Sequence, residues 1–273
     1  MIPARFDYVR PSSIEDAIGA LSSNGEEAKF LAGGHSLLPL MKLRLATPSL
    51  LVDVGRLREL RYVRDGADHV TIGALSRHRD LEIDRVLGEH VPLLAHVAGQ
   101  VGDPQVRHRG TIGGSVAHGD PASDLPAALL ALDATFVVLG PSGERAIPAE
   151  QFHRGFLETA LASDEMLVEI RVPKGTGPRW SFQKFNRRAQ DWAIVGVAAA
   201  RNGSTSVSLV NMGSVPLRAA GTEAALNAGA SAREAAERAD EGTDPTSDLN
   251  ASSEFRRHLV RVLVRRALEE VGA

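Results

Sequence analysis

The hydrophobic pattern of the first 55 residues alternates between the two periods of regular secondary structure. Residues 7–10 form a short strand-like stretch, and the short apolar runs at residues 29–32 and 50–53 predict two further strands. After the first run, apolar residues recur every three to four positions, which predicts a helix that Ser12 and Glu15 cap as a capping box. A brief helical turn is predicted over residues 37–41. This spacing predicts a small unit of strand–helix–strand type.

From Tyr62 onward the pattern changes to a hairpin, helices and two more strands. The dipeptide Asp65-Gly66 between two apolar runs predicts a hairpin over residues 62–72. Helices are predicted over residues 76–84, 91–101 and 122–132, and strands over residues 135–139 and 166–172. Residues 102–110 show no periodicity and are predicted to form a loop. The proline- and glycine-rich stretch 173–178 is the strongest linker signal in the chain.

Beyond this linker the sequence predicts a small sheet followed by helices. Strands are predicted over residues 180–185, 192–200 and 206–212, the last two joined at Asn202-Gly203. The alanine-rich stretch 219–239 and a final helix capped by Ser252 complete the pattern. The polar segment 240–253 between them is predicted to be mobile. Three arginines of the last helix are predicted to form a solvated face, with docking to an acidic partner as the alternative: Arg257, Arg261 and Arg265.

The composition restricts the classes of function open to the chain. Its 273 residues are 43% hydrophobic and 24% charged, which is ordinary for a soluble protein of one or two domains. A formal net charge of −3 gives no basic surface for nucleic acid, and we expect no transmembrane segment and no signal peptide. Because cysteine is absent, iron–sulfur clusters, thiolate zinc sites and disulfides are excluded from this chain. A redox centre here must be an organic cofactor, or a metal held by histidine and carboxylates.

Two segments with paired glycines are the strongest candidates for a binding site. They are Ala32-Gly33-Gly34-His35-Ser36 and Thr111-Ile112-Gly113-Gly114-Ser115, named here the first and the second glycine loop. Paired glycines let backbone amides converge on one anionic oxygen, and the loop hydroxyls add donors. Two such nests would suit a pyrophosphate, although two plain turns are an equally good interpretation of the residues alone. Neither loop matches the Walker A or the Rossmann fingerprint.

At these residues the chain resembles the FAD-binding medium subunit of molybdenum hydroxylases, the family of the aerobic carbon monoxide dehydrogenase medium subunit and the xanthine dehydrogenase FAD domain. The matching stretches follow the family order: residues 30–45, 103–126, 164–173 and, more loosely, 184–195. The resemblance covers residues 3–225 and implies an α+β fold. A two-subdomain FAD-binding domain of the vanillyl-alcohol-oxidase or PCMH type would span 1–175, divided into about 1–55 and 56–175. A small α+β domain with an antiparallel sheet would span 176–273.

The resemblance also implies a noncovalent FAD and its ligands, with the two glycine loops bracketing the pyrophosphate. Asp124 would accept a hydrogen bond from a ribose or ribityl hydroxyl; alternatively it is only a charge at a helix N-terminus. Leu167 would flank the adenine, or belong simply to a strand core. Lys42 and Lys184 would lie near phosphate or the edge of the flavin ring, with surface lysines as the alternative. Trp192 stands where the family carries an aromatic beside the isoalloxazine; a core tryptophan is the alternative.

Two departures from the family pattern change details of this expectation. The second glycine loop ends in Ser115, and His118 follows, at positions where asparagine is common in the family. Both residues keep the capacity to form hydrogen bonds. The resemblance therefore still implies the cofactor, with different local contacts.

The function implied is that of an electron relay. A molybdenum subunit carrying a molybdopterin cofactor would hydroxylate a substrate, and a small subunit with 2Fe-2S clusters would pass the electrons to FAD on this chain, which would reduce an external acceptor. No catalytic or metal-ligating residue is expected here. We expect a dimer of heterotrimers in the cytoplasm, or at the inner face of the membrane through the complex. The alternatives are an oxidase with FAD linked through His35, a nucleotide-binding regulatory module, and a metal site at His108, His118 and Asp120.

Overall fold

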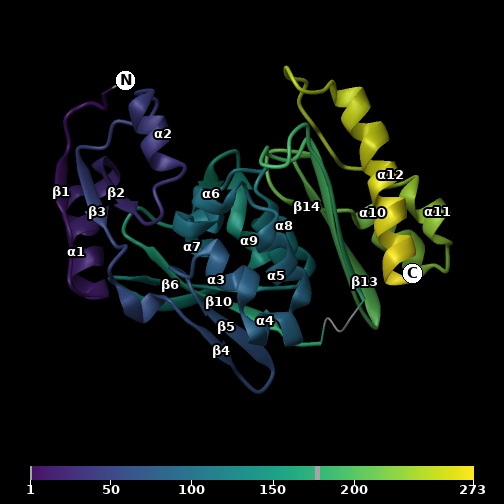
Figure 1. Ribbon diagram of the computed structural model, residues 1–273, viewed down its shortest axis with the longest axis horizontal. Helices are drawn as coiled ribbons and strands as arrows, with labels where there is room; N and C mark the ends of the chain where they lie inside the picture. Colours follow the sequence, from purple (N-terminus) through teal and green to yellow (C-terminus); the bar gives the residue numbers. More distant parts are fainter. Residues whose placement is uncertain (1, 176–178) are drawn as a thin grey trace.

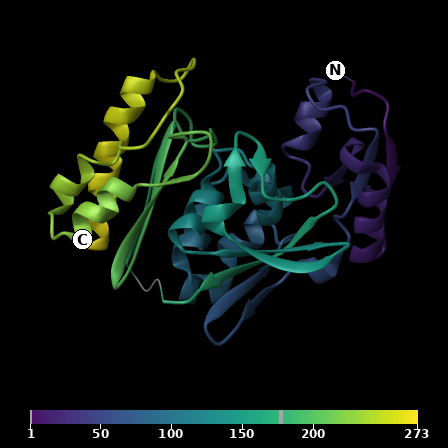
Figure 2. The same ribbon diagram turned by 180° about the vertical axis from the view of Figure 1, so that it is seen from behind.

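The computed structural model describes residues 2–175 and 179–273. The last part of the predicted linker, 176–178, lies outside the described residues. Three parts follow one another along the chain and in space, with the N-terminal part and the C-terminal part on opposite sides of the middle one (Figure 1). The view from behind shows the same order (Figure 2).

The N-terminal part is a three-stranded parallel sheet with two helices. Its strand order is β1-β3-β2, with β1 at Asp7–Val9, β2 at Ala28–Leu31 and β3 at Leu50–Asp53. Helix α1 spans Ile14–Asn24 and α2 spans Leu37–Lys42, so the predicted strand–helix–strand unit is present. The predicted capping box is wrong. Ser13, not Ser12, caps α1, because its Oγ accepts a hydrogen bond from the Asp16 amide at 3.1 Å.

The middle part is built on a five-stranded antiparallel sheet of order β4-β5-β10-β6-β7. The strands are β4 (Val63–Asp65), β5 (His69–Gly73), β6 (Thr135–Gly140), β7 (Gly143–Pro148) and β10 (Met166–Pro173). A two-stranded sheet of β8 (His153–Gly155) and β9 (Glu158–Thr159) adjoins it. The sequence pattern predicted four of the five main strands and missed β7, whose residues are mostly exposed and lack an apolar run.

Seven helices accompany this sheet in the described part of the chain. They are α3 (His78–Ile83), α4 (Arg85–His90), α5 (Pro92–Gly99), α6 (Pro104–Arg109), α7 (Ile112–His118), α8 (Asp124–Ala131) and α9 (Ala149–Phe152). The predicted loop over 102–110 is wrong, because α6 lies there. Asp103 caps α6, with its Oδ1 2.9 Å from the Val106 amide, and Pro104 begins the helix.

The C-terminal part is a four-stranded antiparallel sheet covered by helices. The strand order is β11-β12-β13-β14, with bounds Trp180–Phe185, Val195–Asn202, Ser204–Val210 and Leu217–Arg218. The alanine-rich stretch forms two helices instead of one, α10 (Ala220–Asn227) and α11 (Ala232–Ala236), because Gly229 adopts a φ of +86° between them. The last helix, α12, spans Ser253–Val271 and is capped by Ser252 as predicted.

The polar segment 240–253 has fixed partners, contrary to its predicted mobility. Asp240 accepts two hydrogen bonds from Arg261, at 2.7 and 2.8 Å, and Asp248 pairs with the buried Arg256 at 2.7 Å. Arg257 donates to Thr243 at 3.1 Å. Two of the three arginines predicted to form a solvated face therefore anchor this segment to α12.

Helix α8 joins the middle and C-terminal parts. All of its residues are buried, and it packs against α5 and α7 on one side and against β12 and β13 on the other. Figure 1 shows α8 between the middle helices and the C-terminal sheet. The buried side chains of α8 belong to one hydrophobic cluster with residues of both parts. Because the free energy gained by burying apolar surface grows with the area removed from water, this shared helix stabilises the docking of the two parts.

Candidate functional site

A large cavity lies where the three parts meet. Its volume is about 830 Å³, within the size range of small-molecule sites. Its lining comes from both glycine loops, the N-terminal end of α8, strand β10 and, from the C-terminal part, strand β11 with the loop that follows it. Most of the candidate residues line this cavity: Ala32, Gly33, Gly34, His35, Ser36, Thr111, Gly113, Gly114, Ser115, Asp124, Leu167, Lys184 and Trp192.

Two candidate residues do not reach the cavity. Lys42 is exposed at the last residue of α2, which matches the alternative of a surface lysine. Ile112 points into the hydrophobic core and is fully buried there. The Ile112 side chain therefore does not contribute to the cavity, although the neighbouring residues of the second glycine loop line it.

The first glycine loop packs directly against the two residues that precede the second glycine loop. A Cβ atom on Gly33 would lie 2.5 Å from the carbonyl oxygen of Arg109 and 2.8 Å from the Cα atom of Gly110. Real Cβ atoms do not approach backbone so closely, so glycine at position 33 is required for this contact. The sequence suggested two loops acting together, and in the structure both loops line the same cavity.

The first glycine loop keeps its backbone amides available. Among the described residues, no protein group accepts a hydrogen bond from the amides of residues 33–36. Gly34 adopts a φ of +77°, which glycine allows without strain, and its carbonyl accepts a hydrogen bond from the Leu38 amide at the start of α2. Ser36 precedes α2 without capping it through its side chain. This loop can therefore offer amides and a hydroxyl to an anion.

The second glycine loop differs from the predicted nest. It is not an open strand end but the first turn of α7, which Thr111 caps by accepting a hydrogen bond from the Gly114 amide at 3.1 Å. The Gly113 amide donates to the carbonyl of Ala74 at 2.9 Å, and the amides of Ile112 and Ser115 donate to the carbonyls of Ser76 and Thr111. The prediction of free converging amides is wrong for this loop, because a hydroxyl residue ahead of the glycines starts a helix.

A buried ion pair stands beside the loops. Asp124 is the first residue of α8, and its Oδ2 lies 2.6 Å from the Nζ of Lys184 on β11. Both side chains are less than one-tenth exposed, so the alternative of a surface lysine is wrong for Lys184. Burial raises the pKa of Asp124 to about 6, while the Lys184 ammonium acts in the opposite direction. The other carboxylate oxygen, Oδ1, is buried and has no partner among the described residues.

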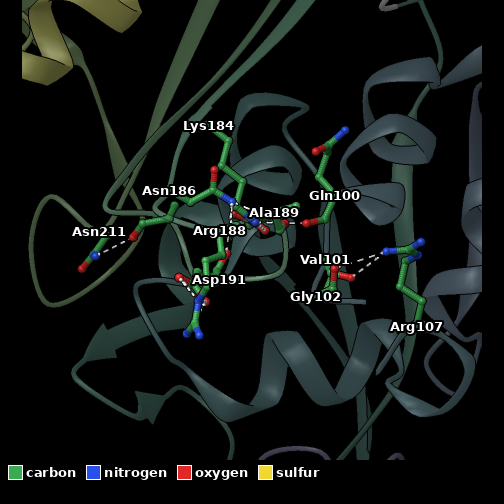
Figure 3. Close-up of polar contacts among 12 residues, drawn as sticks. Gln100, Val101, Gly102, Arg107, Lys184, Asn186, Arg188, Ala189, Asp191 and Asn211 are labelled. Atoms are coloured by element: carbon green, nitrogen blue, oxygen red, sulfur yellow. Dashed lines mark hydrogen bonds and ion pairs between the residues drawn. The ribbon is translucent and has the colours of Figure 1, made fainter. Parts of the chain in front are cut away.

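Leu167 and Trp192 occupy opposite kinds of environment. Leu167 is buried on β10, next to an irregularity in the pairing with β6, and lines the cavity. Trp192 lies ahead of β12 and is 55% exposed, so it is not the core tryptophan of a hairpin. Its loop is held in place locally: Asn186 donates to the carbonyls of Arg188 and Ala189, and Arg188 pairs with Asp191 at 3.0 Å (Figure 3).

Residues 4–175 match the family described as "FAD binding domain in molybdopterin dehydrogenase", and residues 180–271 match the "CO dehydrogenase flavoprotein C-terminal domain". The chain belongs to the flavoprotein family of the molybdopterin dehydrogenases. It is 41% identical to the carbon monoxide dehydrogenase medium chain of Hydrogenophaga pseudoflava, covering 100% of this chain and 99% of that one. It is 30% identical to the xanthine dehydrogenase FAD-binding subunit of Escherichia coli O157:H7, covering 97% and 96%.

Solved structures agree with this family. The Hydrogenophaga pseudoflava carbon monoxide dehydrogenase that lacks the Mo-pyranopterin moiety has a chain that superposes with a TM-score of 0.95 at 41% identity, covering 100% of this chain and 99% of that one. Quinoline 2-oxidoreductase from Pseudomonas putida 86 superposes with a TM-score of 0.93 at 31% identity, covering 100% and 99%. The resemblance and the α+β fold expected from the sequence are confirmed, and the chain is an oxidoreductase subunit of this family.

Some cavity residues of this flavoprotein could not be found from the sequence. His78 is almost fully buried under the second glycine loop, where its Nε2 lies 3.5 Å from Ser115 Oγ. A Cβ on Gly110 would lie 2.7 Å from the same ring, so the glycine makes room for the imidazole. Burial, with smaller contributions from His35 and Arg107, lowers the pKa of His78 to about 4 and keeps it neutral. The only sequence signal was the extra glycine at position 110.

A second cavity adjoins the first across Trp192. It has a volume of about 660 Å³, and Asp191 and Trp192 line both cavities. The exposed Phe156 and the buried Arg256 line its other sides. In the described part of the chain, no group of three or more histidine and acidic residues is arranged to hold a metal, and no helix is long and apolar enough to cross a membrane.

Proposed function

We propose that this chain is the FAD-carrying electron-transfer subunit of a molybdenum hydroxylase complex. It would accept electrons from iron–sulfur clusters on a partner subunit and pass them to an external acceptor. The observation that carries this proposal is a cavity lined by the first glycine loop, whose amides at 33–36 have no protein acceptor among the described residues, and by Asp124, whose buried Oδ1 has no partner there, within a member of the family. Because the chain has no cysteine, the clusters must belong to another subunit.

The residues present fit FAD in chemistry and in space. The amides of residues 33–36 and the hydroxyl of Ser36 suit phosphate oxygens, and Asp124 Oδ1 suits a ribose or ribityl hydroxyl. Leu167 supplies an apolar surface for the adenine, and Trp192 an exposed ring beside the flavin. Bound FAD supplies the two-electron redox chemistry, while these residues hold and orient it. His78 beneath the second glycine loop contributes a neutral ring, so it adds no charge next to the phosphates.

We propose that FAD is held noncovalently. His35 lines the cavity, but residues 180–271 belong to the carbon monoxide dehydrogenase flavoprotein family and not to a substrate domain of an oxidase, so the His35-linked oxidase is not favoured. Acid precipitation of the purified protein should leave the yellow chromophore in the supernatant. Colour that stays with the pellet would overturn the noncovalent assignment and favour the His35 linkage.

We propose that the partners are a small subunit with 2Fe-2S clusters and a large molybdenum subunit, arranged as a dimer of heterotrimers in the cytoplasm or at the inner face of the membrane. Relatives named as medium chains or complex subunits support the general arrangement. Purification from the native host through a tag on this chain should recover both partners, with iron and molybdenum in the eluate. The chain alone, recovered with full FAD but no partner under gentle conditions, would contradict the proposal.

The proposed distribution of FAD, iron–sulfur clusters and molybdenum over different subunits can be tested directly. In the isolated chain, no candidate hydroxylation substrate should reduce the flavin, because the chain has neither clusters nor a molybdenum site. In the complex, substrate should bleach the flavin absorbance near its visible maximum, and removal of the iron–sulfur subunit should abolish the bleaching. Substrate-dependent flavin reduction in the isolated chain would contradict the proposed role.

A further inference from the structure

The proposed function does not use the second cavity, whose volume is about 660 Å³. Its walls come from both domains. The FAD-binding domain supplies residues 120–122 and Phe156, and the C-terminal domain supplies the loop between β11 and β12, the turn after β13 and the segment that precedes α12. Because Asp191 and Trp192 line both cavities, the second cavity adjoins the first at these two residues.

The wall of the second cavity contains a buried guanidinium group with one donor unused. Arg256 is only 1% exposed; it donates to the carbonyl of Ile194 and to Asp248 Oδ2, the latter at 2.7 Å. Its Nε is buried and has no partner among the described residues. A buried donor that stays unpaired costs free energy until an acceptor arrives. Arg256 therefore favours a ligand that brings a hydrogen-bond acceptor.

The walls around Arg256 are held by hydrogen bonds between segments. Asn211 adopts a φ of +61°, in the left-handed region that few residues other than glycine occupy. Its side-chain amide donates to the carbonyl of Ala193 at 2.8 Å, and its backbone amide donates to the carbonyl of Pro121 at 2.9 Å. Figure 3 shows the side chain of Asn211 reaching a backbone carbonyl beside the loop of Asp191. Backbone strain that is fixed by its surroundings is common at binding sites.

Two aromatic rings of the lining are left open to solvent. Phe156, in the turn between β8 and β9, is 66% exposed, and Trp192 is 55% exposed. Aromatic rings are the usual contact surfaces of small-molecule sites, where they stack on planar ligands. These two side chains therefore favour a ligand that contains a flat ring.

The charges of the lining disfavour an anionic ligand. Two of its guanidinium groups already pair with carboxylates of the same wall, at 3.0 and 2.7 Å. Asp120 and Asp244 have no ion-pair partner among the described residues, so their negative charges face a phosphate or carboxylate ligand uncompensated. Carboxylates outnumber guanidinium groups by four to three in the lining: Asp120, Asp191, Asp244 and Asp248 against Arg187, Arg188 and Arg256.

We infer that the second cavity is the binding site of the external electron acceptor, and that this acceptor is an uncharged planar ring with carbonyl oxygens, of the quinone class. Arg256 donates its unused N–H to a ring carbonyl, Phe156 packs on the ring, and Trp192 separates the ring from the flavin. The inference rests on the proposed function, because it takes FAD as the occupant of the first cavity. The transfer balances: reoxidation of the reduced cofactor releases two electrons and two protons, and the quinone takes up two of each as both carbonyls become hydroxyls.

The chain offers a matched control for Phe156. Phe255, at the start of α12, is 44% exposed and lines neither cavity; its ring packs on Phe185 with a centroid distance of 6.2 Å. Phe156→Ala and Phe255→Ala therefore both remove a partly exposed phenyl ring, and only the first changes the second cavity.

The first experiment measures the binding of menadione to the oxidised, FAD-loaded, full-length protein by isothermal titration calorimetry, with FAD content and melting temperature for each variant. Phe156→Ala should weaken menadione binding about tenfold with FAD content unchanged, and Phe255→Ala should leave it within twofold of wild type. No binding to wild type, equal affinity in Phe156→Ala and wild type, or release of FAD by menadione would overturn the inference. A wild-type chain that holds no FAD would instead overturn the proposed function.

Two further variants test the donor and the space. Arg256→Lys keeps a cation for Asp248 but removes Nε, so menadione should bind about fivefold more weakly. Because Arg256 is buried and this change also acts on stability, Ser214→Trp at the exposed edge of the lining is the second variant: its indole should block menadione while FAD content and melting temperature stay as in wild type. Wild-type affinity in both variants would place menadione elsewhere and refute the inference.

Competition tests the chemical class of the acceptor. NAD⁺ carries a pyrophosphate, which the unpaired carboxylates of the lining should repel, so an equal concentration of NAD⁺ should not displace menadione. Displacement of menadione by NAD⁺, with an NAD⁺ affinity that also falls in Phe156→Ala, would show that the cavity takes a dinucleotide and that the quinone class is wrong.

Discussion

The two glycine loops share a sequence pattern but differ in what their backbone amides do. In the first glycine loop, the amides of residues 33–36 donate to no protein group among the described residues. In the second, the amides of residues 112–115 donate to the carbonyls of Ser76, Ala74 and Thr111 and to the Thr111 hydroxyl. The first loop can therefore bind an anion through its backbone, whereas the second contributes shape and the Ser115 hydroxyl.

The order of residues around the glycine pair explains the difference. In the second glycine loop, Thr111 stands three residues ahead of Gly114, which is the spacing of an N-cap, so the chain closes into the first turn of α7. In the first glycine loop, Ser36 follows the glycines and does not cap α2 through its side chain. A hydroxyl before the pair gives a capped helix; a hydroxyl after it leaves an open loop. The glycine pair by itself does not distinguish these cases; the position of the hydroxyl residue does.

The largest effect is expected where the first glycine loop contacts Arg109 and Gly110. Gly33→Val would place a branched side chain against the Arg109 carbonyl and push the first glycine loop away from the backbone of Arg109 and Gly110. Overpacking of this kind costs about 1–3 kcal/mol and occasionally more, so we expect a clear drop in the free energy of unfolding together with complete loss of flavin. Melting curves and the flavin-to-protein ratio measure both. A variant with wild-type flavin content would show that the close contact of Gly33 with Arg109 and Gly110 is not needed for binding.

The next largest effect is expected in the second glycine loop, where substitutions at Gly114 and Gly113 should affect flavin binding and stability differently. A Cβ on Gly114 would meet only the Thr111 hydroxyl, at 2.8 Å, so Gly114→Val should fold with a loss of about 1 kcal/mol, the size of a weakened N-cap. We still expect it to purify without flavin, because the added methyl groups enter the cavity. Gly113→Val is the control: its Cβ would lie 2.6 Å from Ala74, so it should lose more stability. Equal flavin content in Gly114→Val and wild type would remove this loop from the site.

The sequence predicted the parts of the site whose chemistry is carried by adjacent residues. Both glycine loops, Asp124 and Leu167 line the cavity as the resemblance implied, and the main strands follow from their apolar runs. Helix α6 was missed because it has only six residues and no buried face, although Asp103-Pro104 is a proper start signal. Lys42 was placed at the site by the resemblance, yet it is exposed at the end of α2 and does not line the cavity.

Contacts between distant segments were beyond the reach of sequence patterns. His78 packs on Gly110, Arg107 pairs with Glu82, and Lys184 bridges to Asp124, each between segments far apart in the sequence. The availability of an amide is likewise a tertiary property, because the Gly113 amide is used by Ala74 on another segment. Composition and periodicity report which face is apolar; they do not report which polar group meets which.

The free energy of unfolding should depend on pH through His78, the buried histidine that packs under the second glycine loop. The pKa of His78 is lowered by burial to about 4, below its ordinary value, so the unfolded chain takes up a proton at this residue before the folded chain does. The stability that depends on neutral His78 is thus present above about pH 6.5 and is lost as the pH falls toward 4, at up to about 1.4 kcal/mol per pH unit. Asp124, with a raised pKa, has the opposite slope between its ordinary value and about 6.

Variants can separate the pH dependence of stability that comes from His78 from the one that comes from Asp124. Urea unfolding of wild type and His78→Gln between pH 4 and pH 7 should show that the variant lacks the loss of stability on acidification. Asp124→Asn should remove the opposing slope and make the acid sensitivity of the remaining protein steeper. If His78→Gln and wild type lose stability in parallel, the imidazole is not the group that titrates beneath the second glycine loop.

The smallest effect is expected from Trp192, which belongs to neither loop. Because its side chain is 55% exposed, Trp192→Ala should lower the free energy of unfolding by about 1 kcal/mol, well below the 3–5 kcal/mol of a buried tryptophan. If the ring stacks on the flavin, its loss removes about 0.5–1.5 kcal/mol of interaction, which weakens FAD binding roughly two- to tenfold. Flavin fluorescence should rise as the quenching ring is removed, and the rate of reoxidation should change, while the loops still hold the cofactor. Unchanged fluorescence and affinity would show that Trp192 does not contact the flavin and that the loops, Asp124 and Lys184 hold it alone.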